Sequence, residues 1–170
     1  MSQFPQQKFL SFFPLKVIIH GAFWADKATM EKFDWKDEYS VGIEKFDRQH
    51  RHLLEIVAKL AENNNTVSNP NLVSETLTEM LNYAREHFID EEELMQEYGY
   101  NETEPQKKQH AYFLKMTAEL SIRALNDKQS LTANILEFLG NWWIIHILKW
   151  DMKYKGFFEH KLSKRKSAAV

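Results

Sequence analysis

The sequence predicts an all-α protein, an antiparallel up-down-up-down four-helix bundle with an N-terminal extension. Three observations predict this class. Glycine and proline are scarce, with 5 and 4 among 170 residues, so long stretches lack any residue that breaks a helix. Apolar residues recur at helical spacing in four segments of roughly 20–27 residues. The connections between these segments are short, which favours antiparallel neighbours.

The first predicted helix runs from about residue 43 to 63 and has one inward face. This face is continuous only if a histidine also points inward. Its positions are Phe46, His50, Leu53, Leu54, Val57 and Leu60. The run "NNNTVSNPN" that follows is typical of a loop.

The other three helices follow in order. The second runs from about residue 72 to 98, and Gly99 is its natural stop. The third runs from about 104 to 126. At its start, Thr103-x-x-Gln106 has the form of a capping box, in which the glutamine reaches back to the cap backbone. The fourth starts after Ser130, a candidate N-cap, and runs to about residue 156.

Composition and charge exclude several classes of function. The chain has no cysteine, which excludes disulfides, thiolate metal sites and cysteine nucleophiles. Its formal net charge of -2 gives no indication of a nucleic-acid partner. No segment is apolar enough to span a membrane, and no signal peptide is recognisable, so we expect a cytoplasmic protein. We expect residues 1–32 to be an N-terminal extension, 33–157 the bundle and 158–170 a basic C-terminal tail.

Each predicted helix places one histidine on its apolar face. These are His50, His87, His110 and His146. A single inward histidine is usually an ordinary core residue, but one on every helix indicates a site. Glu91 follows His87 by one helical turn, whereas Asp151 follows His146 by five residues, an imperfect fit to one straight face.

Imidazoles and carboxylates that converge in a bundle core are ligands for iron, zinc, copper or manganese. The residues alone leave one ion and two ions both open, and the alternative is a chance set of core histidines. Nearby, His52 is predicted to be solvated, and Glu92 and Glu93 to form an exposed acidic run. Asp47 either orients the His50 imidazole or solvates the helix start.

Four pieces of the chain together resemble the hemerythrin family. They are "YSVGIEKFDRQH" preceded by Trp35, "HFIDEEELM", "HAYFL" and "HILKWD", in the order and spacing of that family over about residues 33–156. The resemblance implies two iron ions with an oxo or hydroxo bridge. His50 and His87 would bind one iron, His110 and His146 the other, and Glu91 and Asp151 would bridge them.

The resemblance also implies a function. Dioxygen would bind at an open position on an iron held by two histidines, for storage, delivery or sensing of oxygen rather than for catalysis. We expect a monomer, and a sensor would need a separate redox or signalling partner. A third reading of the chain is an interaction module that uses the bundle without metal.

Two positions depart from the family pattern. Gln106 stands where the family usually has a seventh ligand, a histidine. We favour capping by Gln106, or a solvent molecule in the vacant ligand position, over coordination by Gln106. The loss of a histidine also points to an alternative function, that of a di-iron redox enzyme of a peroxidase or ferroxidase-like kind. Trp143 stands where the family commonly has leucine in the oxygen pocket; it either narrows the pocket or hydrogen-bonds a ligand there, or simply packs.

Overall fold

The computed structural model describes residues 33–63, 70–126 and 131–168. The expected N-terminal extension, 1–32, lies outside the described residues. Long helices dominate the described ranges: α2 (Glu44–Asn63), α3 (Pro70–Tyr98), α4 (Thr103–Asn126), α5 (Leu131–His146) and α6 (Met152–Ala168). A short 3₁₀ turn, η2 (Asp37–Tyr39), precedes them, and a π-helical segment, η3 (Ile147–Asp151), joins α5 to α6.

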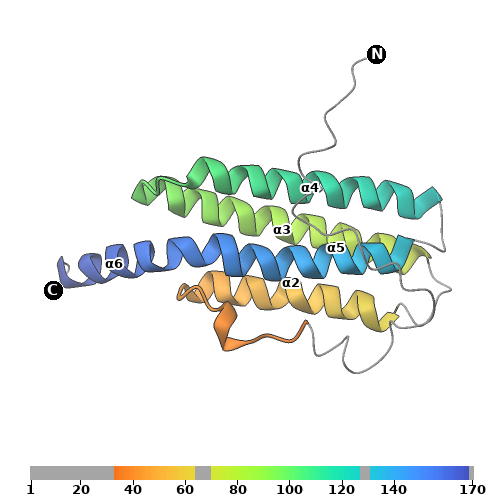
Figure 1. Ribbon diagram of the computed structural model, residues 1–170, viewed down its shortest axis with the longest axis horizontal. Helices are drawn as coiled ribbons and strands as arrows, with labels where there is room; N and C mark the ends of the chain where they lie inside the picture. The colour runs from red at the N-terminus through yellow and green to blue at the C-terminus, as the bar shows by residue number, and fades with distance from the viewer. Residues whose placement is uncertain (1–32, 64–69, 127–130, 169–170) are drawn as a thin grey trace, which may run out of the picture.

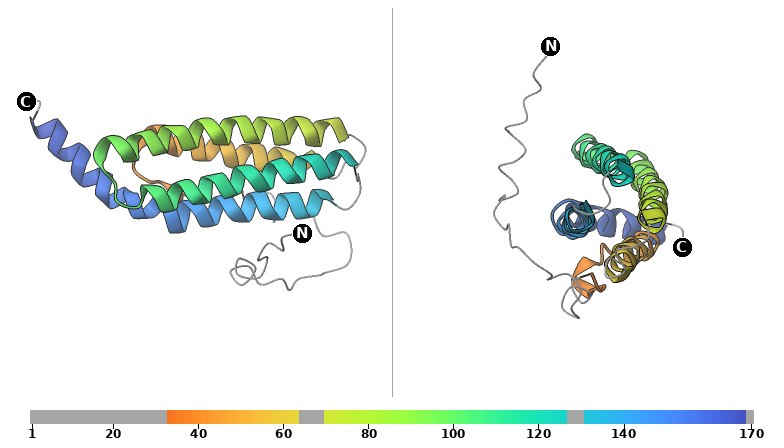
Figure 2. Two further views of the ribbon diagram at one scale, coloured as in Figure 1. Left: turned by 90° about the horizontal axis from the view of Figure 1, so that it is seen from above. Right: turned by 90° about the vertical axis from the view of Figure 1, so that its right-hand side faces the viewer.

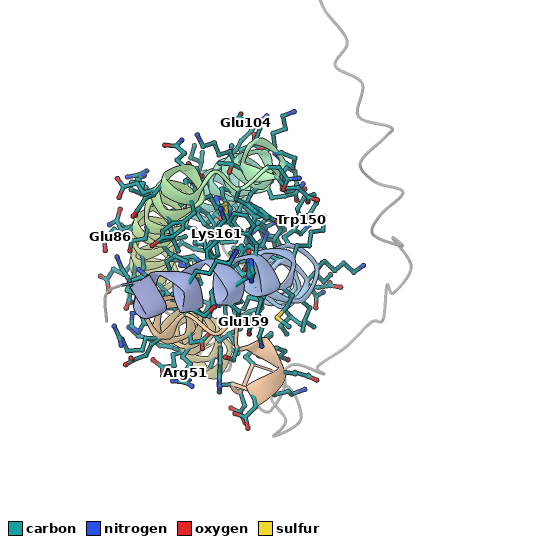
Figure 3. All side chains as sticks on the ribbon, turned by 90° about the vertical axis from the view of Figure 1, so that its left-hand side faces the viewer. Arg51, Glu86, Glu104, Trp150, Glu159 and Lys161 are labelled. Carbon is teal, nitrogen blue, oxygen red and sulfur yellow. The ribbon has the colours of Figure 1, made fainter. Side chains whose placement is uncertain are left out.

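These elements form the predicted antiparallel four-helix bundle. Helices α2, α3 and α4 are three of its members, and α5, η3 and α6 together form the fourth (Figure 1). Seen along the bundle, the helices group around one common axis (Figure 2). Charged side chains such as Arg51, Glu86 and Glu104 point outward, so their cost of desolvation is avoided (Figure 3).

The helix faces follow the sequence pattern. Every position predicted on the inward face of the first helix is buried in α2. The predicted stop of α3 is also confirmed, because Gly99 takes a φ of 67°, a left-handed conformation that glycine adopts without steric cost. The N–H of Tyr100 then bonds the carbonyl of Met95 at 2.8 Å and closes the helix end.

The fourth helix is longer than predicted. We expected it to end near residue 156 and a basic tail to follow, but α6 continues to Ala168. The segment after Gly156 contains neither glycine nor proline and is rich in lysine, which is a good helix former. In Figure 1 this last part of α6 extends beyond the ends of the other helices.

The chain before α2 is tied to the bundle at both of its ends. Phe33 is buried and packs directly on Gly140 of α5, where an added Cβ would lie 2.0 Å from the Phe33 ring. Asp47 accepts hydrogen bonds from the Ser40 hydroxyl at 2.7 Å and the Val41 N–H at 2.8 Å. Asp47 therefore holds the preceding segment against the start of α2. It does not orient His50, whose Nδ1 has no hydrogen-bond partner in the described ranges, and its carboxylate bonds protein groups rather than only solvating the helix start.

The core has two parts. The larger lies between α2, α3, α4 and α5, and the smaller contains Phe46, Met95, Tyr154 and Phe158 toward the α6 end. The inward polar residues contact both parts, since the His87 ring lies 6.0 Å from Phe46 of the smaller part. No helix of the described ranges is long and apolar enough to cross a membrane.

Candidate metal centre

All six predicted ligand residues meet inside the bundle. They are His50 of α2, His87 and Glu91 of α3, His110 of α4, His146 of α5 and Asp151 of η3, and each is at most 2% exposed. Ligand atoms of His50, His87 and Glu91 lie within 4.8 Å of one another, and so do those of Glu91, His110 and His146. The two groups share Glu91, so the arrangement offers two adjacent cation positions.

The π-helical segment η3 explains the five-residue spacing between His146 and Asp151. In an α-helix, a residue five positions along is rotated away from the first one's face. A π-helical turn closes its hydrogen bonds from residue i to i+5 and so brings that residue back onto the same face. Oδ1 of Asp151 accordingly lies 3.2 Å from Nε2 of His146.

The four imidazoles direct their Nε2 atoms at one another. The Nε2 atoms of His50 and His87 are 3.1 Å apart, and those of His110 and His146 are 3.2 Å apart. On the outer side, Nδ1 of His87 lies 3.1 Å from Oε1 of Gln49. Because that oxygen can only accept, Nδ1 of His87 carries the proton and its Nε2 presents a lone pair inward.

Both carboxylates are held by a neutral donor on one oxygen. The Tyr154 hydroxyl donates to Oε1 of Glu91, and the Gln106 amide donates to Oδ1 of Asp151 at 2.5 Å. The other oxygens, Oε2 of Glu91 and Oδ2 of Asp151, have no hydrogen-bond donor in the part of the chain that the structure describes. Burying such carboxylates is costly unless a cation compensates them, so the residues present fit a metal centre.

The electrostatics of the histidines agree with this fit. Burial holds the pKa of His87 well below its ordinary value and also lowers the pKa of His146, so both rings are neutral, as a metal ligand requires. At His110 burial acts to lower the pKa, but the neighbouring carboxylates of Glu91 and Glu92 outweigh it and raise the pKa to about 9. A cation held by these carboxylates would compete with that proton for His110.

The predicted capping box is wrong. Gln106 is 2% exposed, and its side chain reaches Asp151 of η3 rather than the backbone at the start of α4. The Thr103 hydroxyl instead donates to the Tyr100 carbonyl at 2.6 Å. Gln106 stands one turn before His110 on the same inward face, and the packing of α4 against the fourth helix places a buried acceptor within its reach.

Trp143 lies against the histidine cluster. Its ring is wholly buried, and its centroid is 5.7 Å from that of His87, 6.4 Å from His50 and 6.3 Å from His146. The indole also stacks on Phe88 with centroids 5.5 Å apart. Trp143 therefore packs, as one of its readings predicts, and it does so directly beside the candidate ligands.

Sequence reasoning missed three residues that hold the cluster: Gln49, Glu92 and Tyr154. Glu92 was predicted to be exposed, which is wrong: it is half-buried and accepts a hydrogen bond from Nδ1 of His110 at 2.8 Å. Glu93 is exposed, as predicted. The partners of Gln49 and Glu92 lie on other helices, so no local pattern marks them. Tyr154 had a signal, because it follows the inward Asp151 by three residues.

Comparisons with known proteins agree with the geometry. Residues 41–158 match the family model described as the hemerythrin HHE cation binding domain. A bacteriohemerythrin of Clostridium acetobutylicum is 32% identical over 126 residues, covering 72% of this chain and 98% of the relative. A bacteriohemerythrin of Stenotrophomonas maltophilia is 31% identical over 120 residues, covering 71% of this chain and 77% of the relative.

Animal and structural relatives extend the comparison. The myohemerythrin of Theromyzon tessulatum is 27% identical over 126 residues, with 74% of this chain and 93% of the relative covered. The solved structure of a hemerythrin point mutant superposes with a TM-score of 0.66 at 25% identity, covering 72% of this chain and 93% of that one. The chain thus belongs to the hemerythrin family, whose members bind dioxygen at a non-haem di-iron centre.

Proposed function

We propose that this protein binds dioxygen reversibly at an open coordination position of a di-iron centre, for storage, delivery or sensing of oxygen. One observation carries the proposal: two buried three-residue ligand groups share Glu91 in the middle of the bundle. The iron pair supplies the electrons that hold dioxygen. The protein supplies the ligands, their orientation and an environment without bulk water.

The assignment of ligands is part of this proposal. His50 and His87 would hold one iron and His110 and His146 the other, because their Nε2 atoms converge in these two pairs. The carboxylates Glu91 and Asp151 would be shared between the two. Two observations support this role of the carboxylates. Each lies within 4 Å of histidine nitrogens from both pairs, and each keeps one oxygen without a hydrogen-bond donor among the described residues.

The surrounding side chains prepare these ligands. Gln49 fixes the tautomer of His87, and Glu92 does the same for His110. On the other side of the cluster, the rings of Phe88, Trp142 and Trp143 pack against the imidazoles and exclude water. A dry, pre-oriented site favours a bound ligand that can leave unchanged over one that is hydrolysed or protonated.

The test is iron per chain together with the optical spectrum. The spectrum is recorded under air, after anaerobic reduction, and after oxygen is readmitted. Two irons per chain and a visible charge-transfer band that bleaches without oxygen and returns with it would support the oxygen carrier. One iron or none, or a band that never returns, would contradict it.

A di-iron redox enzyme is the second candidate, and the geometry of Gln106 favours it. The Gln106 side chain is directed at Asp151, to which its amide nitrogen donates, and it offers no imidazole. The iron beside His110 would therefore have one nitrogen ligand fewer than with a histidine at this position. A vacant position on that iron would admit peroxide or a further substrate and would speed oxidation of the site. In this reading the protein consumes peroxide or oxidises ferrous iron.

Gln106→His separates the two candidates. We expect the variant to keep its oxygen-bound form longer and to consume peroxide more slowly than the wild type, because the added imidazole occupies the vacant position. Gln96→His adds the same side chain at an exposed position of α3 and serves as the control. Equal decay of the oxygen-bound form in wild type and Gln106→His would show that the departure at residue 106 has no functional consequence.

A further inference from the structure

The indole N–H of Trp143 is a buried donor without an acceptor in the described part of the chain. Trp143 is 0% exposed, and its Nε1 atom has no hydrogen-bond partner there. A buried N–H that makes no hydrogen bond destabilises the folded protein, so native proteins rarely keep one without a reason. A leucine or phenylalanine would fill an apolar position without this cost.

The surroundings of Trp143 explain why the donor is unpaired. Around the indole lie Phe88, Phe113 and Trp142, with centroids 5.5, 5.1 and 5.1 Å away, and none of these side chains offers an oxygen acceptor. The other aromatic rings beside the indole are the imidazoles of His50, His87 and His146, whose Nε2 atoms lie in the cluster. A small ligand held at the centre, beside these imidazoles, would bring an acceptor to this donor.

From this placement, and resting on the proposed function, we propose that the Trp143 indole N–H donates a hydrogen bond to the outer atom of a small ligand held at the centre. The class of ligand is a diatomic or triatomic molecule whose outer atom bears negative charge when bound, of which azide is a convenient probe. A hydrogen bond to a charged acceptor is stronger than a neutral one, and exclusion of water strengthens it further. Trp143 thereby selects ligands by charge on the outer atom as well as by size.

A second tryptophan provides a matched control. The Nε1 atom of Trp35 also lacks a hydrogen-bond partner within the described ranges. The Trp35 ring, however, packs against Tyr39 and under the guanidinium of Arg51, at 5.9 and 4.5 Å, in the segment before α2. Trp35→Phe removes an unpaired indole N–H of the same kind away from the histidine cluster.

The experiment measures azide binding to the iron-loaded, oxidised protein by optical titration. We expect Trp143→Phe to raise the dissociation constant of azide about tenfold or more, because a hydrogen bond to a charged group is lost. Trp35→Phe should leave the constant unchanged. Azide binding that is equal or tighter in Trp143→Phe would overturn the proposal, because it would show that the indole only occupies space.

A spectroscopic readout separates a hydrogen bond from a change of pocket size. In the wild type the infrared stretch of bound azide should shift when the protein is exchanged into D₂O. Trp143→Phe and Trp143→Leu should both lose that shift, because both lack the indole N–H although they differ in size. If a variant does not fold or load iron, the wild type still decides the matter. The ¹⁵N-labelled indole N–H signal of Trp143, recorded in zinc-loaded protein, should move downfield when azide is added, and a static signal with azide bound would refute the proposal.

Failure of this inference and failure of the proposed function give different results. If the protein loads two irons and cycles with oxygen, but Trp143→Phe binds azide as well as the wild type, the proposed function stands and the proposed hydrogen bond of Trp143 is refuted. A protein that never loads two irons fails at the earlier measurement, and zinc with azide then still tests the indole directly.

Discussion

The four inward histidines differ in what holds their outer nitrogens. A neutral amide, that of Gln49, accepts from His87, whereas a carboxylate, that of Glu92, accepts from His110. The Nδ1 atoms of His50 and His146 have no partner in the ranges that the structure describes. A carboxylate on the outer nitrogen makes an imidazole a stronger donor to metal. As a metal ligand His110 would be the strongest donor of the four, and this would compensate for Gln106, which stands one turn away where the family pattern has a further histidine.

Glu92→Gln tests this compensation. We expect the variant to hold the iron nearest His110 more weakly, by roughly 10–100-fold, because it loses the charged partner of that histidine. Iron retention against a competing chelator is the measurement. Glu93→Gln changes the exposed neighbouring carboxylate and should retain iron like the wild type. Equal iron retention in both variants would show that Glu92 does not contribute to metal binding.

The metal-free protein should show a characteristic dependence of stability on pH. His87 and His146 have lowered pKa values because they are buried, so the unfolded chain binds protons more readily and stability is lost as pH falls below about 6.5. His110 acts in the opposite sense. Its pKa is raised to about 9, so its contribution is complete below about 6.5 and is lost as pH rises through about 9.

Chemical unfolding in the presence of a chelator, repeated from pH 5 to 10, checks both limbs. We expect a maximum of stability near neutral pH and a decline on either side. In Glu92→Gln the pKa of His110 falls, so the decline above neutral pH should be smaller than in the wild type. A steeper alkaline decline in that variant would contradict the role of Glu92 as the partner that charges His110.

At the scale of elements, two local features position the centre. The π-helical segment η3 brings Asp151 onto the inward face that His146 occupies. The close approach of Phe33 to Gly140 fixes the segment before α2 against α5, three residues ahead of Trp143. The first feature acts through helix register and the second through the absence of a side chain at residue 140.

Gly140→Ala and Gly156→Ala form a matched pair. Alanine at residue 140 would collide with the Phe33 ring, and we expect a loss of roughly 1–3 kcal/mol in the free energy of unfolding. Alanine at residue 156 meets no atom within 4 Å in helix α6, so we expect a gain of about 0.4–1 kcal/mol. Chemical denaturation gives both values.

A double variant locates the cause. Phe33→Ala removes the ring that collides, so Gly140→Ala should cost less in the Phe33→Ala background than alone. Additive effects would mean that the cost at residue 140 arises elsewhere in α5.

At the scale of the whole molecule, the bundle encloses charge that it does not neutralise by itself. Glu91 and Asp151 are 0% exposed, and each has an oxygen that lacks a hydrogen-bond donor in the described ranges. Binding of cations offsets this cost and occurs only in the folded state, because the ligands come from every helix of the bundle. Folding and metal binding are therefore linked.

Metal removal should lower the thermal stability of the protein. A ligand present at 1,000 times its dissociation constant stabilises the folded state by about 4 kcal/mol, so the iron-loaded protein should unfold at a clearly higher temperature than the chelated one. Differential scanning calorimetry of both forms makes the comparison. An unchanged unfolding temperature would favour the reading of the chain as a metal-free interaction module.

The sequence by itself determined the four helices, their inward faces and five of the six residues at the centre, all but Asp151. Helical spacing determines which side chains share a face, and burial of the apolar stripes then turns those faces toward one axis. His50, His87, His110 and His146 could be found this way because each interrupts an apolar stripe of its own helix. Gln106 and Glu92 also stand near such a stripe, but the predictions for both were wrong because their hydrogen-bond partners lie on other helices.

Only the tertiary structure decided which groups meet across helices. Gln106 donates to Asp151 instead of capping α4, and Glu92 bonds His110 instead of facing water. The inward placement of Asp151 also depended on the π-helical turn, which the five-residue spacing alone left unresolved. The physical reason is common to all three. The rotation and depth at which packed helices meet decide these contacts, and a periodic pattern within one helix carries no information about either.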